Sequence, residues 1–118
     1  MKHTVSLKQN HEFRRLYNKG KSAVTPYLVL YVRRTRRDNN RLGLTVSNKI
    51  GKAVVRNRIR RRLREIYRLR EDKLCRGLDM VIVARGRSTE ASYHQLEKAF
   101  EKACRQLDLM QAESEQKP

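Results

Sequence analysis

The chain has 118 residues, enough for one small domain with a modest core but not for two. It carries 29 Lys and Arg against 12 Asp and Glu, and the formal net charge of +17 indicates a polyanionic partner such as RNA, DNA or an anionic membrane. Because the sequence shows neither a signal peptide nor an 18-residue apolar run, we expect a cytoplasmic protein.

The positive charge is concentrated in the first part of the chain. Residues 1–70 hold 21 Lys and Arg against three acidic residues, whereas residues 71–118 hold eight against nine. The two parts therefore carry +18 and −1. We expect the first part to contact the polyanion.

The first predicted element is a short helix within residues 6–20. Phe13, Leu16 and Tyr17 are spaced at i, i+3 and i+4, and Gly20 provides a stop signal. The spacing puts an aromatic pair on one face of this helix. From the residues alone, ordinary core packing is the preferred interpretation of that face.

Two strands are predicted next. Residues 27–34 alternate between an aliphatic face and a face that carries tyrosines, and residues 41–47 alternate between apolar and small or polar side chains. The polar stretch 36–40 between them reads as a turn. A hairpin is the simplest pairing of the two strands.

A long helix is predicted at 53–72. Its apolar stripe consists of Val55, Ile59, Leu63 and Ile66, with Tyr67 and Leu69 at the margins. The opposite face consists of Asn57, Arg61, Arg64 and Arg68, flanked by Arg58 and Arg60. Like charges at this spacing destabilise an isolated helix, so we interpret the face as a binding surface. Arginine pairs two phosphate oxygens at once, which favours nucleic acid.

Three other interpretations of this helix remain open. It could be a solvated cationic face, or a membrane-surface helix, although the apolar stripe lacks the Trp or Phe typical of the latter. It could also lie in a DNA major groove, but no helix-turn-helix spacing precedes it.

The last predicted elements are a strand and a helix. Residues 79–85 form a nearly continuous apolar run, typical of a central strand, which we expect to pair parallel to an earlier strand through the arginine-rich helix. Ser88, Thr89 and Ser92 are candidate N-caps of the final helix. The order α-β-β-α-β-α predicts a single α+β domain over residues 1–110, a small mixed sheet packed by helices, with a disordered tail at 111–118.

The sequence offers no constellation of catalytic groups. It has no paired carboxylates beside a histidine, no Ser or Cys triad and no acidic metal cluster. Cys75 and Cys104 lack metal or redox spacing and are expected to be reduced thiols, and three scattered histidines cannot form a familiar zinc site. We therefore expect no catalytic residue in the protein, no protein-bound metal and no small-molecule substrate.

The segment GKAVVRNRIRRRLRE, preceded by RLGLTVSNKI and followed by GLDMVIVAR, closely resembles the protein subunit of bacterial ribonuclease P. Arg56-Asn57-Arg58 matches that family's signature, and the resemblance extends over nearly the whole chain. It implies a protein that joins a large catalytic RNA and promotes removal of the 5′ leader from precursor tRNA. It also implies that the RNA performs the chemistry, with magnesium bound mainly by the RNA subunit, and that the connection through the arginine-rich helix is left-handed.

The resemblance assigns two surfaces. The residues expected to contact the catalytic RNA and nearby substrate phosphates are Lys49, Lys52, Arg56, Asn57, Arg58, Arg60, Arg61, Arg64 and Arg68. Those expected to line a cleft for the single-stranded leader are Phe13, Tyr17, Tyr27 and Tyr31.

Two questions stay open at this point. The arginines cannot be sorted between catalytic RNA and substrate, and the Asn57 amide could contact RNA or tie the helix to an adjacent loop. The main alternative function is a structural RNA-binding protein of the ribosomal type, which would show no preference for leader-bearing tRNA.

Overall fold

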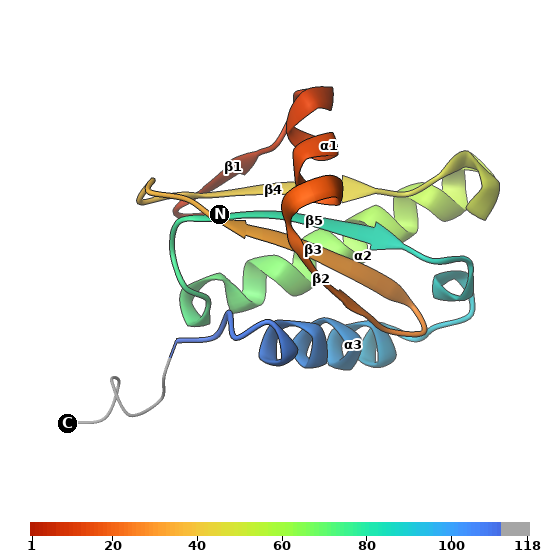
Figure 1. Cartoon of the computed structure of the whole chain (residues 1–118). Coiled ribbons are helices and arrows are strands. Elements are labelled where there is room, and N and C mark those ends of the chain that lie inside the picture. The colour runs from red at the N-terminus through yellow and green to blue at the C-terminus, as the bar shows by residue number, and fades with distance from the viewer. Residues whose placement is uncertain (112–118) are drawn as a thin grey trace.

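Five strands form one mixed sheet in the computed structural model, which describes residues 1–111 (Figure 1). The strands lie side by side in the order β1-β4-β5-β3-β2. Their bounds are Thr4–Ser6 for β1, Lys21–Val24 for β2, Leu28–Arg34 for β3, Asn40–Thr45 for β4 and Leu78–Ala84 for β5.

The apolar strand β5 occupies the centre of the sheet. It pairs antiparallel with β3 and parallel with β4, which confirms the predicted parallel pairing through the arginine-rich helix. The predicted hairpin of β3 and β4 is wrong, because β5 lies between them. The nearly continuous apolar run of β5 suits this central position, because both faces of a central strand are buried. The short edge strands β1 and β2 were not predicted.

Three helices cover the sheet, with bounds Asn10–Lys19 for α1, Ala53–Arg70 for α2 and Tyr93–Gln106 for α3. Figure 1 shows α1 in front of the sheet and α2 behind it. The connection from β4 through α2 to β5 is left-handed, since β4 lies above β5 in that view and both arrows point to the right. This agrees with the resemblance and departs from the usual right-handed rule.

The main core lies between the sheet and helices α2 and α3. Alternate residues of β3 and β5 enter it from the sheet, and α2 contributes Ile59, Leu63 and Ile66. Tyr67 is fully buried there, whereas Leu69, predicted at the margin of the stripe, is 53% exposed. Burial of Cys104 in the same core raises the pKa of its thiol to about 12. A smaller core under α1 contains Leu7, Leu16 and Val81.

The ends of the domain are anchored by specific contacts. Of the predicted N-caps, Ser92 begins α3 with a reciprocal capping box to Gln95. Gln111, the first residue of the predicted tail, donates from its backbone to the Lys73 carbonyl (2.8 Å) and from its side chain to the Leu74 carbonyl (3.1 Å). The rest of that tail, 112–118, lies outside the described residues. Within residues 1–111, no helix has the length and apolar character needed to cross a membrane.

Candidate nucleic-acid interface

The outward face of α2 concentrates unpaired positive charge. Asn57, Arg58, Arg61, Arg64 and Arg68 are all exposed, as their helical spacing predicted. Within residues 1–111, the guanidinium groups of Arg58, Arg61 and Arg64 have no hydrogen-bond or ion-pair partner. We call these three residues the open arginines. Their charge is available to phosphates at the surface of the folded protein.

Other arginines of α2 hold the fold together. Arg56 donates from Nε to the Gly51 carbonyl (3.1 Å) and from Nη1 to Asn48 Oδ1 (2.7 Å). These contacts fix the loop at 48–51, which carries the exposed Lys49 and leads to Lys52 at the start of α2. Asn57 was considered as a residue that could bind the helix to the adjacent loop. Arg56 makes that contact instead, because its longer side chain reaches back along the helix.

Two further polar residues on α2 are paired within the helix. Arg68 donates from Nε and Nη2 to the two carboxylate oxygens of Glu65, each at 2.7 Å, and this contact lowers the pKa of Glu65. Asn57 Oδ1 accepts a hydrogen bond from Arg60 Nη1 at 3.1 Å. Arg68 is therefore less available to RNA than the open arginines.

An aromatic cluster lies on the opposite side of the sheet. The ring centroids of Phe13 and Tyr17 are 6.5 Å apart, and those of Tyr17 and Tyr31 are 5.0 Å apart. Tyr17 is 38% exposed, and its hydroxyl lies 3.0 Å from Thr45 Oγ1. The structure thus brings together three of the four predicted cleft residues.

A hollow of about 530 Å³ opens beside this cluster, between α1 and the end of β4. We call it the leader cleft, after the ligand expected for its aromatic residues. Its lining residues are Asn10, Phe13, Arg14, Tyr17, Leu44, Thr45, Val46 and Arg60.

Tyr27 does not join the cluster. It is partly buried against the main core, and the Arg87 guanidinium lies 5.7 Å from its ring centroid. The alternation from Tyr27 to Tyr31 suggested a shared face, but β3 begins only at Leu28. Tyr27 belongs to the preceding turn, where its backbone N–H donates to Thr25 Oγ1 (3.3 Å), so strand alternation does not set its direction.

Arg60 connects the two surfaces. It extends from α2 to line the leader cleft, where its Nη2 lies 3.5 Å from the Val46 carbonyl oxygen. Arg14 of α1 lines the same hollow. A strand in the cleft would therefore meet guanidinium groups from both helices.

A buried ion-pair network, missed by the sequence analysis, holds α1 over the sheet. Arg41 of β4 donates from Nε and Nη2 to the two carboxylate oxygens of Asp79 on β5 (3.0 and 2.7 Å) and also pairs with Glu12 of α1. Arg37 binds the same Asp79 carboxylate from the turn before β4. Burial by itself would raise the pKa of Asp79, but the hydrogen bonds from Arg41 and Arg37 lower it overall.

The Phe13 ring, which lines the leader cleft, packs directly against the backbone at Gly43. A Cβ atom there would lie 2.6 Å from Cε1 and Cζ of Phe13, so the Phe13 ring rests directly on the glycine. The outward position of Gly43 in its strand was visible in the sequence. Its contact with Phe13 depends on how α1 packs, which no local pattern reports.

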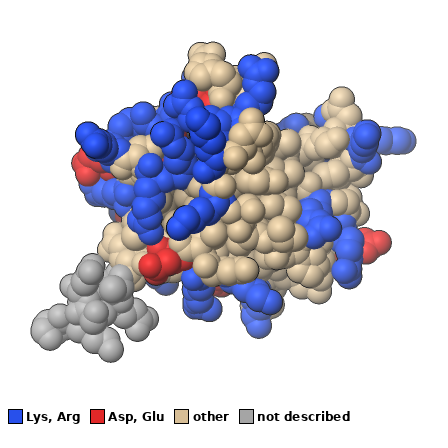
Figure 2. Space-filling model, viewed as in Figure 1, with Lys and Arg blue, Asp and Glu red and all other residues tan. Residues whose placement is uncertain are grey.

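Further positive charge gathers on the face that carries α1. Figure 2 shows many blue atoms on the left of this face, toward the β3–β4 turn, and a mostly uncharged surface to the right of α1. Exposed arginines at the end of β3 and in the turn are Arg33, Arg34, Arg36 and Arg37. These four arginines within residues 33–37 are visible in the sequence as a basic run, which was predicted only as the end of a strand and a turn.

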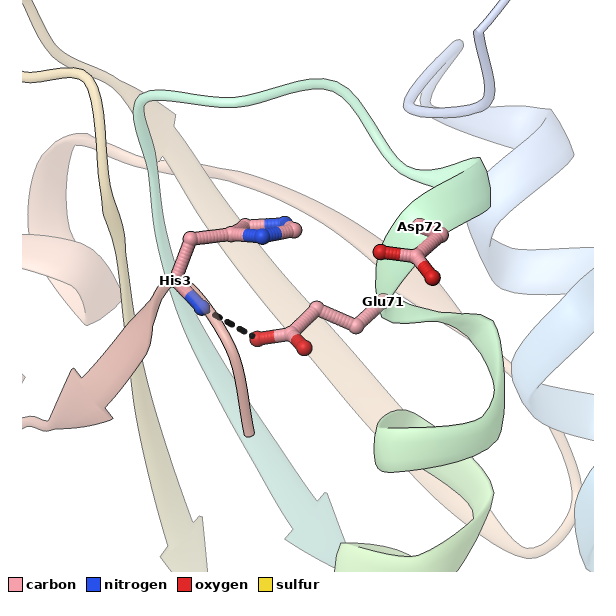
Figure 3. A group of neighbouring side chains, drawn as sticks. All are labelled: His3, Glu71 and Asp72. Carbon is pink, nitrogen blue, oxygen red and sulfur yellow. Dashed lines mark hydrogen bonds between the residues drawn. The ribbon is translucent and has the colours of Figure 1, made fainter.

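One group of described residues has atoms close enough to share a metal ion: His3, Glu71 and Asp72, whose candidate ligand atoms all lie within 4.8 Å of one another (Figure 3). The Glu71 carboxylate already accepts hydrogen bonds from the backbone N–H groups of Lys2 (2.8 Å) and His3 (3.3 Å) and from the Thr4 hydroxyl. Magnesium prefers oxygen ligands in octahedral geometry, whereas this group offers an imidazole, the Glu71 carboxylate that anchors the N-terminal segment, and the Asp72 carboxylate, which pairs with Lys2 (3.3 Å). These residues do not fit a magnesium site.

Comparisons with known proteins agree with this geometry. The family model described as Ribonuclease P matches residues 1–108. The ribonuclease P protein component of Natranaerobius thermophilus is 39% identical over 111 residues, covering 94% of this chain and 96% of the relative. That of Clostridium botulinum is 47% identical over 95 residues, covering 80% of this chain and 86% of the relative.

Solved structures show the same fold. The RNase P protein of Staphylococcus aureus superposes with a TM-score of 0.83 at 29% identity, covering 90% of this chain and 97% of the other. The RNase P protein of Thermotoga maritima gives a TM-score of 0.75 at 29% identity, covering 82% and 92%. The chain belongs to the family of ribonuclease P protein components, the protein part of a ribonucleoprotein enzyme whose catalysis lies in its RNA.

Proposed function

We propose that two surfaces of this protein divide the work within ribonuclease P. The open arginines and the loop at 48–52 bind the catalytic RNA, and the leader cleft binds the 5′ leader of precursor tRNA. The observation that carries this proposal is the position of Arg60, which extends from the arginine-rich helix into an aromatic hollow. A single RNA strand leaving the catalytic RNA could pass from one surface to the other.

The chemistry of the leader cleft suits a single strand of variable sequence. Bases stack on aromatic rings irrespective of their identity, at about 1–3 kcal/mol per base. Tyr17 is exposed enough to receive a base, while Arg14 and Arg60 are placed to pair with backbone phosphates. Paired tRNA presents no free base face to such rings, so the cleft should distinguish leader from mature tRNA.

The protein contributes binding and counter-charge to the reaction. We propose that magnesium ions, held mainly by the RNA, supply the activated water and stabilise the leaving oxygen. Lys and Arg side chains neutralise phosphates of RNA and substrate, which lowers the magnesium concentration needed for assembly. We place this activity in the cytoplasm.

The test is precursor binding as a function of leader length. The holoenzyme, assembled from this protein and its catalytic RNA, is titrated with precursor tRNAs whose leaders range from none to several nucleotides. We expect affinity to rise with leader length. Tyr17→Ala should weaken binding of leader-bearing precursor about tenfold, the equivalent of one stacked base, and leave binding of leaderless tRNA unchanged. Tyr17→Phe is the matched control, because it keeps the ring and removes only the contact with Thr45.

The same titration distinguishes the proposed function from the alternative, a structural RNA-binding protein. If leader length made no difference to affinity in the unmodified holoenzyme, the leader cleft assignment would fail. Stimulation of cleavage at low magnesium, measured in parallel, separates a ribonuclease P subunit from a structural RNA-binding protein, which would bind RNA without accelerating leader removal.

A further inference from the structure

A second hollow, of about 570 Å³, lies between α2 and the start of α3. It shares no lining residue with the leader cleft. Its volume is within the range of roughly 300–1,000 Å³ typical of small-ligand sites. The residues that line it are Met1, Arg61, Arg62, Arg64, Glu65, Arg68 and Tyr93.

The charge of this second hollow suits an anion. Four guanidinium groups face one carboxylate, and that carboxylate, Glu65, is paired through both oxygens with Arg68. Arg61 and Arg64 are open arginines, without a partner among residues 1–111. They can therefore bind phosphate oxygens without breaking an existing contact.

Tyr93 gives the second hollow a fixed aromatic wall. It is the first residue of α3, half-buried, and it packs against the main core. The capping box of Ser92 and Gln95 holds the backbone on one side of it (2.9 and 3.1 Å). Arg62 Nη1 also lies 3.3 Å from the Ala91 carbonyl oxygen, which links this turn to α2. A ring that is already ordered loses little entropy when a base stacks on it.

We propose that the second hollow binds one nucleotide, with its base against Tyr93 and its phosphate between Arg61 and Arg64. A bare phosphate would fill only part of the volume and make no use of the aromatic wall. An acidic peptide would satisfy the arginines but gains less than a planar base from the ring. The nucleotide could be an unpaired residue of the catalytic RNA, in which case the site rests on the proposed function, or a free nucleoside polyphosphate.

The first arm of the test uses free ligands. Adenosine 5′-triphosphate and inorganic triphosphate are titrated into the purified protein by calorimetry at one fixed salt concentration. We expect the nucleotide to bind about tenfold more tightly, because stacking adds to the same phosphate contacts. Tyr93→Leu should abolish that difference and Tyr93→Phe should preserve it. Arg64→Ala should weaken both ligands, whereas Arg105→Ala, an exposed arginine farther along α3, should weaken neither.

The second arm uses the catalytic RNA substituted with 4-thiouridine. If the RNA supplies the nucleotide, irradiation should link it to the peptide that contains Tyr93, and Arg64→Ala should reduce the yield severalfold. If a free nucleotide is the ligand, the first arm gives binding and this peptide stays unlinked. Because Tyr93 is half-buried, thermal unfolding of its variants is measured alongside, and the exposed Arg64 provides an independent test of the site.

Two results would overturn the proposal. One is equal affinity for triphosphate and nucleotide together with no link to the Tyr93 peptide. The other is competition by polyglutamate as strong as that by the nucleotide, which would show a general polyanion surface. Neither result would change the dependence of precursor affinity on leader length. Conversely, if the leader cleft did not bind the leader, nucleotide binding at Tyr93 would be unchanged. The two proposals can therefore be contradicted separately.

Discussion

The arginine face of α2 and the leader cleft, the two regions that we propose face RNA, are built in opposite ways. The first lies on a single helix, is exposed, and carries the three open arginines, which have no partner within residues 1–111. The second is lined by α1, the end of β4 and one arginine of α2, and its aromatic residues pack on Tyr31 of β3. Charge supplies affinity for any phosphate backbone, whereas ordered rings select single strands. Their separation lets affinity and discrimination be changed independently.

The two regions also differ in what supports them. The arginine face needs only a stable helix, which the buried stripe of α2 provides. The leader cleft needs α1 at a fixed height over the sheet, which the Arg41, Asp79 and Glu12 network and the glycine under Phe13 provide. We therefore expect substitutions in the arginine face to act through charge, and substitutions around the leader cleft to act through geometry.

The largest effect is expected from neutralising the open arginines. A triple variant, Arg58→Ala, Arg61→Ala and Arg64→Ala, should bind the catalytic RNA at least about a hundredfold more weakly, since each lost charge-assisted hydrogen bond costs about 1.5–3 kcal/mol. The slope of log affinity against log salt should fall by about two to three. Filter binding at several salt concentrations measures both quantities.

The matched control removes the same charge elsewhere. Lys98, Lys102 and Arg105 are exposed on α3, and their triple replacement by alanine should change RNA affinity by less than about threefold. Equal losses in the two triple variants would mean that net charge, and not the arginine face, determines binding.

A second large effect is expected at Asp79, beneath the leader cleft. Asp79→Asn leaves Arg41 with one carboxylate partner fewer, and removal of one partner from a buried ion pair costs about 3 kcal/mol of unfolding free energy. The loss should also loosen α1 and weaken leader-dependent binding. Urea unfolding at neutral pH measures the first effect.

The stabilisation by the Asp79 carboxylate should depend on pH and be lost in acid. Because the folded-state pKa of Asp79 is lowered, its stabilisation is fully present above the unfolded-state pKa of about 3.9 and is lost as pH falls through the folded-state value. The difference in unfolding free energy between the wild-type protein and Asp79→Asn should therefore narrow below about pH 4. A difference that stays constant down to pH 2 would show that Asp79 is not held ionised by its arginines.

Sequence reasoning succeeded where structure is local. The apolar stripe and the arginine face follow from one helical period, and the burial of Ile59 and the exposure of Arg61 bear this out. The family motif then gave the partner RNA. No local pattern could show that β5 separates β3 from β4, because strand order depends on which pairing buries the central strand best.

The cleft was predicted less well because it depends on contacts between distant residues. Tyr27 was assigned to it through the family resemblance, but β3 begins one residue later and Tyr27 packs against the main core. Arg41 and Asp79 went unnoticed because they lie 38 residues apart, and only the parallel register of β4 and β5 pairs them.

A smaller effect is expected at the glycine beneath Phe13. In Gly43→Ala the new methyl group would lie 2.6 Å from the ring, so Phe13 must move. Overpacking of this kind costs about 1–3 kcal/mol, and we expect the lower end because the ring can tilt toward the open cleft. Leader-dependent affinity should fall severalfold while affinity for the catalytic RNA stays constant. Titrations with leader-bearing and leaderless tRNA separate the two, and a uniform loss for both substrates would contradict the cleft geometry.

The smallest effect is expected at Asn57, on the boundary between the two regions. Its carbonyl oxygen accepts from Arg60, which leaves its amide N–H groups exposed beside the open arginines. Asn57→Ala should change the free energy of unfolding by no more than about 0.5 kcal/mol, because alanine favours the helix and the lost contact is exposed.

Affinity for the catalytic RNA should nevertheless fall about threefold in Asn57→Ala, through the lost amide contact and the released Arg60. Urea unfolding and RNA titration on the same preparation measure the two quantities, stability and RNA affinity. Asn57→Gln is the control variant, because it keeps an amide. Lower stability with unchanged RNA affinity would instead make Asn57 an internal support of Arg60. Loss of leader-dependent affinity alone would place Asn57 with the cleft, through Arg60, and not with the arginine face.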